Sequence, residues 1–145
     1  PELEQETILE ENLVFIAGRE INHPFSADIA RTLLVFRSGC SYRARLEQWV
    51  RTRGMLPVKI LEFGTLEAIL GCVEAGMGIS LVPASVIQHY VGKGMHQGLW
   101  IQPMEENEGR METLFVRRRD ALMTPALHHF LALSRELFFA ANFSQ

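Results

Sequence analysis

Two short polar runs in this sequence could bind an anion or a carbonyl group. One run, Gly64-Thr65, opens a predicted helix, and the other, Ser38-Gly39-Cys40-Ser41, lies between a predicted strand and the next predicted helix. The backbone N–H groups at a helix start carry partial positive charge, so they attract carboxylates and phosphates. A hydroxyl at the same place can instead cap the helix, which is an ordinary structural role. For the run at residues 38–41, the residues alone favour neither role.

The residues after Thr65 predict a capped amphipathic helix followed by a buried strand. Apolar residues have the i, i+3, i+4, i+7 spacing of one helix face: Leu66, Ile69, Leu70 and Val73. Gly76 can adopt the positive φ that ends a helix. Residues 79–82 then form a short apolar run that Pro83 ends, as expected of a strand in a sheet interior.

Strands and helices alternate along most of the chain. Strands are predicted at residues 13–17, 33–37, 58–63, 79–82, 99–103 and 111–117, and helices at 41–53, 66–75, 84–91 and 125–141. The acidic residues 1–12 are predicted to be a loose lead-in, residues 18–32 irregular, and residues 105–110 a surface loop or hairpin connection. This alternation predicts an α/β domain with a largely parallel sheet.

Composition narrows the classes of function. The chain has 145 residues, 48% of them apolar and 21% charged, as is usual for a globular domain with one core or two small lobes. Its net charge of −3 argues against binding of duplex DNA by this stretch, because such binding needs a basic face. No apolar run reaches the roughly 18 residues of a membrane-spanning helix. Two cysteines predict no disulfide framework and are interpreted as reduced thiols of a cytosolic protein.

Familiar enzyme and metal motifs fail on spacing. A Cys-x5-Arg phosphatase loop starting at Cys40 would need arginine where Leu46 stands, and residues 78–82 lack the last glycine of a Gly-x-Ser-x-Gly elbow. His128 and His129 are adjacent, so on a helix they point about 100° apart and cannot share a metal. We therefore expect no enzyme activity, no cofactor and no metal site.

Three blocks of the sequence resemble one protein family. Residues 62–83 resemble the effector-binding domain of LysR-type transcriptional regulators, and residues 34–49 resemble the start of that domain's second subdomain. Asn12 to Ile16 and His23-Pro24-Phe25 are similar to the stretch just before it. The resemblance covers residues 11 to 139, with the blocks in the family's order.

This resemblance implies a periplasmic-binding-protein-like (type 2) α/β fold of two subdomains, with the first subdomain incomplete. Residues 1–32 would be a remnant of the first subdomain, residues 33–104 the second (βαβαβαβ), and residues 105–145 a crossing strand and a C-terminal helix that returns to the first. The residues at 13–17 and 111–117 would be the two crossing strands.

The family's effector cleft lies between the subdomains, beside the two polar runs. The resemblance implies these effector contacts: Ser38, Gly39, Cys40, Ser41, Phe63, Gly64 and Thr65. Two helix starts facing one cleft favour a small anionic or polar ligand. Tyr42 and Phe63 could each form a wall of the cleft or belong to the core, and the sequence favours neither role.

The implied function is ligand sensing in a bacterial, cytoplasmic transcription regulator. DNA would be bound only through an N-terminal helix-turn-helix that this sequence lacks, and the full-length protein would be a homodimer or tetramer, with no membrane contact. Since the chain begins with Pro1, we expect it to be a fragment. One alternative is a solute-binding protein of a transport system, which shares this fold. Another is an interaction module whose role is dimerisation. The sequence does not identify the effector.

Overall fold

The computed structural model describes residues 2–19, 25, 32–55 and 58–142, which divide into two compact units. The first, here called the sheet unit, is Asn12–Gly109. The second, here called the ribbon unit, consists of residues 2–11 and 110–142 in its described part.

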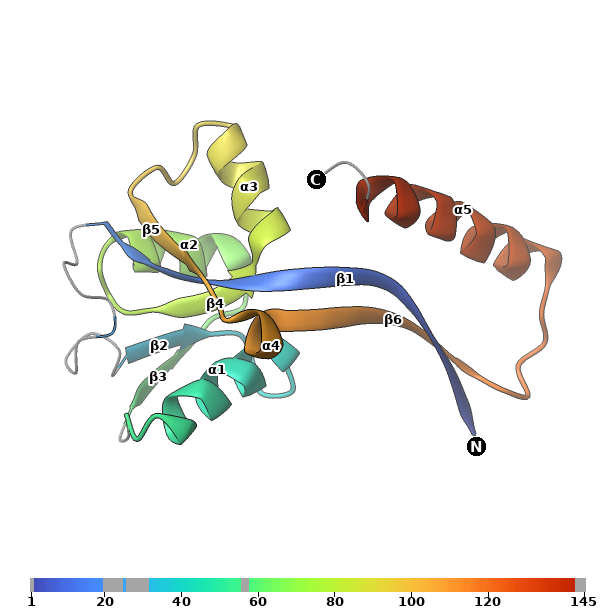
Figure 1. Ribbon diagram of the computed structural model, residues 1–145, viewed down its shortest axis with the longest axis horizontal. Coiled ribbons are helices and arrows are strands. Elements are labelled where there is room, and N and C mark those ends of the chain that lie inside the picture. Colours follow the sequence, from blue (N-terminus) through green and yellow to red (C-terminus); the bar gives the residue numbers. More distant parts are fainter. Residues whose placement is uncertain (1, 20–24, 26–31, 56–57, 143–145) are drawn as a thin grey trace. The chain divides into compact units, whose positions relative to one another are not determined.

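The sheet unit contains strands in the order β3-β2-β4-β1-β5 (Figure 1). β2 (Thr32–Val35) pairs in parallel with β3 (Lys59–Glu62). Two backbone hydrogen bonds join β2 to the entry of β4 (Ser80–Pro83): the Leu34 N–H donates to the Ile79 carbonyl at 2.9 Å, and the Ile79 N–H donates to the Thr32 carbonyl at 3.0 Å. The predicted α/β fold is confirmed, but its sheet is mixed, with parallel and antiparallel strand pairs.

A single antiparallel strand lies inside this sheet. β1 (Leu3–Gly18) places Phe15 opposite Leu81 of β4 and opposite Gln102 of β5 (Leu99–Pro103), and it runs antiparallel to both strands. Its apolar run, residues 13–17, is buried throughout. A strand covered on both faces requires such an unbroken apolar run, which explains its central place.

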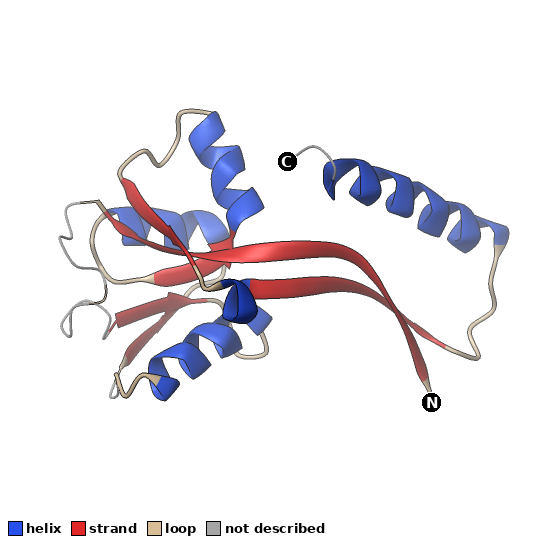
Figure 2. Cartoon of the chain, viewed as in Figure 1, coloured by secondary structure: helices blue, strands red, loops and turns tan. Residues whose placement is uncertain are grey.

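Helices cover both faces of the sheet (Figure 2). Alternation along β1 turns Val14 and Ile16 toward one core cluster, which also contains residues of α2 (Leu66–Glu74) and α3 (Ala84–Gly92). Phe15 points to the other face, where its ring centroid lies 4.6 Å from that of Trp49 of α1 (Ser41–Thr52). The predicted helices at 41–53, 66–75 and 84–91 are thus confirmed within a residue or two at each end.

The junction between α2 and β4 depends on two glycines. Gly76 has φ 79°, a conformation that favours glycine, and it follows directly after the helix. A Cβ on Gly78 would lie 2.3 Å from the Thr32 carbonyl oxygen, so no larger residue fits between β2 and β4. Ser80, itself buried, donates its hydroxyl hydrogen to the Leu34 carbonyl at 2.6 Å and strengthens the same junction.

The ribbon unit corrects one prediction. Residues 1–12 were expected to form a loose lead-in, but β1 begins at Leu3 and pairs with β6 (Arg110–Arg118). Acidic residues in β1 and just before it form ion pairs with distant arginines: Glu2–Arg119, Glu4–Arg117, Glu6–Arg135 and Glu10–Arg110. The two partners of each pair stand 100 or more positions apart, so local spacing in the sequence could not connect them.

One further prediction needs correction, and another is confirmed. The stretch 105–110, expected to be a loop, contains the short helix α4 (Glu106–Gly109) and the first residue of β6. α5 (Pro125–Asn142) starts as predicted, with the Leu127 N–H donating to the Thr124 hydroxyl at 3.2 Å.

The inner face of α5 is only partly buried. Helical spacing places these residues on it: Leu127, Phe130, Leu131, Ser134, Leu137 and Phe138. Leu131 and Ser134 are buried, whereas Phe130 is 56% exposed and Leu137 70% exposed. The elements described around α5 cover one narrow stripe of the helix and leave the rest of the face open.

Some sequence predictions concern residues or boundaries on which the structure gives no result. The His23-Pro24 block and most of the irregular stretch 18–32 lie outside the described residues. The predicted subdomain limits at residues 32 and 104 stay a prediction. Among the helices that the structure describes, none has both the length and the apolar character needed to cross a membrane.

Candidate ligand-binding site

A pocket of about 590 Å³ lies in the sheet unit where β2 and β3 end. Its lining comes from the turns that follow these strands: Phe36, Arg37, Ser38, Cys40, Tyr42, Phe63 and Gly64. The carboxyl ends of adjacent parallel strands are where open α/β sheets bind ligands. The volume falls within the range of small-molecule sites, roughly 300–1,000 Å³.

The turn after β2 forms one side of the pocket. The Cys40 N–H donates to the Arg37 carbonyl at 3.2 Å, and Gly39 takes φ 95° to close this turn. Cys40 is the N-cap residue of α1, yet its side chain makes no capping hydrogen bond. The first turn of α1 therefore begins beside the pocket without a cap from residue 40.

The turn after β3 forms the other side. The Phe63 N–H donates to the Val35 carbonyl at 2.9 Å, which extends the pairing of β3 with β2 by one residue. Gly64 follows, and Thr65 is the N-cap of α2, its hydroxyl oxygen accepting from the Ala68 N–H at 3.3 Å. The capping role predicted for Thr65 is confirmed. Its hydroxyl hydrogen has no acceptor among the described residues.

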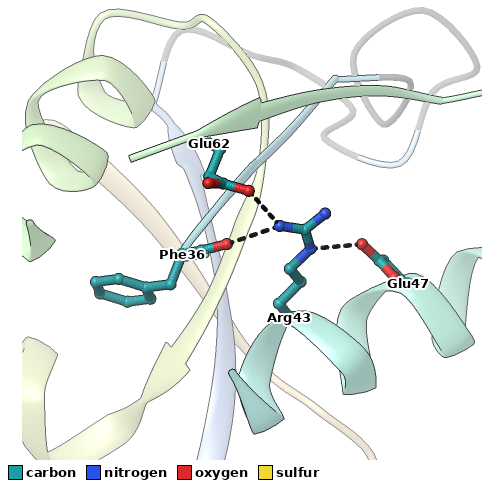
Figure 3. A network of polar contacts seen from close by, with 4 residues as sticks. All are labelled: Phe36, Arg43, Glu47 and Glu62. Atoms are coloured by element: carbon teal, nitrogen blue, oxygen red, sulfur yellow. Dashed lines mark hydrogen bonds and ion pairs between the residues drawn. The ribbon is translucent and has the colours of Figure 1, made fainter. Parts of the chain in front are cut away.

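Arg43 connects the two sides of the pocket (Figure 3). Its guanidinium donates to the Phe36 carbonyl at 3.1 Å and to the Glu62 carboxylate at 2.7 Å, while Nε donates to Glu47 at 2.7 Å. The hydrogen bond to Glu47, followed by the one to Glu62, raises the pKa of the Arg43 side chain further above its already high ordinary value. Arg43 thus fixes α1 against the ends of both strands.

The structure brings most of the predicted contact residues together. The lining includes Ser38, Cys40, Phe63 and Gly64. The remaining predicted residues belong to the same two turns but are not among the lining residues: Gly39, Ser41 and Thr65. As ligand contacts, all seven stay predictions.

Sequence reasoning missed Phe36 and Arg37 as lining residues. Both directly follow the end of β2, one and two residues before Ser38. The signal that could have identified them is this position, since residues just beyond a parallel strand face the binding edge of the sheet. Tyr42, which the sequence placed equally well in the wall or the core, is in the wall.

The lining is suited to binding small molecules. It contains one cation, hydroxyl and thiol groups, and aromatic rings, and none of its described residues carries a carboxylate or an imidazole. Acid–base chemistry normally uses such groups. In the part of the chain that the structure describes, no three His, Cys, Asp or Glu side chains gather closely enough to hold a metal ion.

Comparison with known sequences identifies regulators as relatives. The chain is 42% identical over 142 residues to the HTH-type transcriptional regulator GltR of Bacillus subtilis, covering 95% of this chain and 46% of GltR. It is 41% identical over 131 residues to the HTH-type transcriptional regulator SoxR of an Arthrobacter species, covering 90% of this chain and 44% of SoxR. The chain thus spans just under half the length of these curated relatives.

Solved structures share the fold at low sequence identity. The regulatory domain of Synechocystis CcmR in complex with 2-PG matches with a TM-score of 0.75 at 22% identity, over 94% of this chain and 67% of that one. The BenM effector-binding domain with its effector benzoate matches with a TM-score of 0.71 at 19% identity, over 100% of this chain and 67% of that one. The profile of the LysR substrate binding domain matches residues 1–138. From this match and the identity to GltR and SoxR, the chain belongs to the LysR substrate-binding domain family.

Proposed function

We propose that this chain is the ligand-sensing region of a LysR-type transcriptional regulator and that the pocket after β2 and β3 holds its small-molecule effector. The observation that carries the proposal is the pocket itself, about 590 Å³ with a mixed polar and aromatic lining. Named relatives at about 40% identity are transcriptional regulators, which favours regulation over solute transport.

In the full-length protein, DNA would be contacted by a helix-turn-helix segment, as the names of the relatives indicate. Such a regulator would work in the cytoplasm and assemble as a dimer or tetramer. A ligand can change DNA binding only if its affinity differs between two states of the protein. The predicted change is in the arrangement of the two subdomains around the bound ligand.

Filling the pocket tests its role in ligand binding. A Cβ on Gly64 would meet only the Arg37 guanidinium, at 4.0 Å, so Gly64→Leu places a side chain in the pocket without disturbing the backbone. Gly71→Leu is the matched control, because Gly71 lies on α2 with open space around its Cβ. Small carboxylates, starting with benzoate and shikimate, would be titrated into each protein and followed by calorimetry.

We expect a ligand that binds the wild type and Gly71→Leu but not Gly64→Leu. Equal affinity for all three proteins would place the binding site elsewhere. Testing the regulatory role requires the full-length protein. In a mobility-shift assay, the same ligand should change the affinity of that protein for promoter DNA. The sensing role would be contradicted if no ligand that binds in the pocket changed the affinity of the full-length protein for DNA.

A further inference from the structure

Two arginines near the pocket have different surroundings. Arg37 lies in the turn after β2, and Arg43 lies in the first turn of α1. Arg43 makes three hydrogen bonds, to Phe36, Glu47 and Glu62. The side chain of Arg37, by contrast, has no hydrogen bond or ion pair with any residue that the structure describes, although it is one of the pocket lining residues. Among the described residues, its charge therefore has no partner at the place where a ligand would lie.

The carboxylates of Glu62 and Glu67, on the two elements that flank the turn after β3, already accept hydrogen bonds from other side chains. Glu62, at the end of β3, accepts from Arg43 at 2.7 Å. Glu67, in the first turn of α2, accepts from the Tyr90 hydroxyl at 3.0 Å. Arg37 Nη2 lies 4.0 Å from the point that a Gly64 Cβ would occupy, so the guanidinium extends toward the turn after β3. The absence of a side chain at Gly64 leaves space beside this cation.

The remaining lining favours an apolar ligand body. Phe36 and Phe63 are half-buried and pack against the core cluster, so their positions in the wall are fixed from behind. Tyr42 adds a third ring from the first turn of α1. A ligand that satisfied Arg37 with one end would place its other end among these rings.

We infer that Arg37 determines the chemical class of the ligand: a small organic acid, with its carboxylate paired to the Arg37 guanidinium and its apolar or ring portion against Phe36 and Phe63. A guanidinium forms two parallel hydrogen bonds with a carboxylate and cannot do so with a neutral amide. This inference rests on the proposed function, because it uses the same pocket. Arg43 has a different role, which is to hold the pocket walls in position.

The experiment compares benzoate with benzamide, a neutral molecule of nearly the same shape. Each would be titrated into the 15N-labelled 145-residue chain, with the Arg37 Nε–H and the Gly64 backbone amide as NMR reporters. We expect benzoate to bind about tenfold or more tightly than benzamide, since hydrogen bonds between charged groups are stronger than neutral ones. Arg37→Gln should remove this difference, and Arg37→Lys should retain part of it.

Arg51→Gln is the matched control. It removes the same charge from an exposed position of α1, where Arg51 donates only to Gln48, and it should leave benzoate binding unchanged. Equal affinity for benzoate and benzamide at the Gly64 reporter would overturn the role of Arg37 while leaving the pocket as a ligand site. The role of Arg37 would also be overturned if its NMR resonance responded to neither compound, even at high concentration. The mobility-shift assay of the full-length protein would then test the proposed function separately.

Discussion

The sheet unit and the ribbon unit are stabilised by different interactions. In the sheet unit, side chains from β1, β2, β4, β5, α2 and α3 form a core cluster in which Leu34, Ile69 and Leu70 are fully buried. In the described part of the ribbon unit, only Leu131 and Ser134 are buried. Four ion pairs between the glutamates of residues 2–10 and the arginines of residues 110–135 connect its elements instead.

This difference predicts different sensitivities. Burial of apolar area does not depend on salt at moderate concentrations or on pH, but it is sensitive to any loss of volume. Exposed ion pairs contribute little individually, and salt screens them within about 10 Å at 0.1 M. The pocket belongs to the sheet unit, and two of its walls, Phe36 and Phe63, pack against the core cluster. The ion pairs of Arg43 add a part that depends on salt.

Removing a core side chain should produce the largest effect. Leu70→Ala is expected to lower the free energy of unfolding by about 2–5 kcal/mol, because it leaves a cavity in the core cluster. Leu137→Ala, in the ribbon unit, makes the same chemical change at a side chain that is 70% exposed, and should stay within about 0.5 kcal/mol of wild type. Urea unfolding measures both. Similar losses for the two variants would mean that the α5 face is covered in solution.

A methyl group at Gly78 should have the next largest effect. Gly78→Ala places a Cβ against the Thr32 carbonyl and should cost about 1–3 kcal/mol, because β2 and β4 must move apart. Gly71→Ala is the control, since its Cβ enters open space on α2 and alanine favours the helix. Thermal unfolding should therefore shift in opposite directions for the two variants. A neutral Gly78→Ala would show that this junction is looser than the distances indicate.

Matched caps allow a finer comparison. Thr65→Ala and Thr124→Ala each remove an N-cap hydroxyl, at α2 of the sheet unit and at α5 of the ribbon unit, and each should cost about 1 kcal/mol. Only Thr65→Ala is expected to weaken ligand binding, because Thr65 follows the pocket residue Gly64. Calorimetric titration of both variants with a ligand of the wild type checks this. Wild-type affinity in Thr65→Ala would remove Thr65 from the set of ligand contacts.

The smallest effect concerns pH. The hydrogen bond from Arg135 lowers the pKa of Glu6. A carboxyl whose folded pKa lies below its unfolded value of about 4.3 stabilises the fold above that value, and this contribution is lost as the pH falls through the folded pKa. In Glu6→Gln, the stability of the ribbon unit should change less between pH 6 and the acid region than in wild type, as followed by NMR of β1 amides. A Glu6 that titrates at its ordinary value would argue against the ion pair.

Local signals were sufficient to predict much of the sheet unit. The Thr65 cap, the apolar spacing in α2 and the unbroken run in β1 each follow from residues a few positions apart. In the ribbon unit, the strand at 111–117 and the helix at 125–141 were also predicted locally. The start of β1 at Leu3 was not, because the partner of Glu6 stands 129 positions away. The site was intermediate: the strand ends located the two turns, but sequence spacing does not give the direction of the Arg37 side chain toward Gly64.

β1 has a further consequence for insertions and deletions. Its 16 residues belong to both units, and its alternate side chains include Glu4 and Glu6 in the ribbon and Val14 and Ile16 in the core cluster. Since side chains alternate between faces, deleting one residue near position 11 would exchange the faces of one segment relative to the other. Deleting two residues would preserve the alternation. The length of this strand is therefore constrained to change in steps of two, unless a bulge absorbs the odd residue.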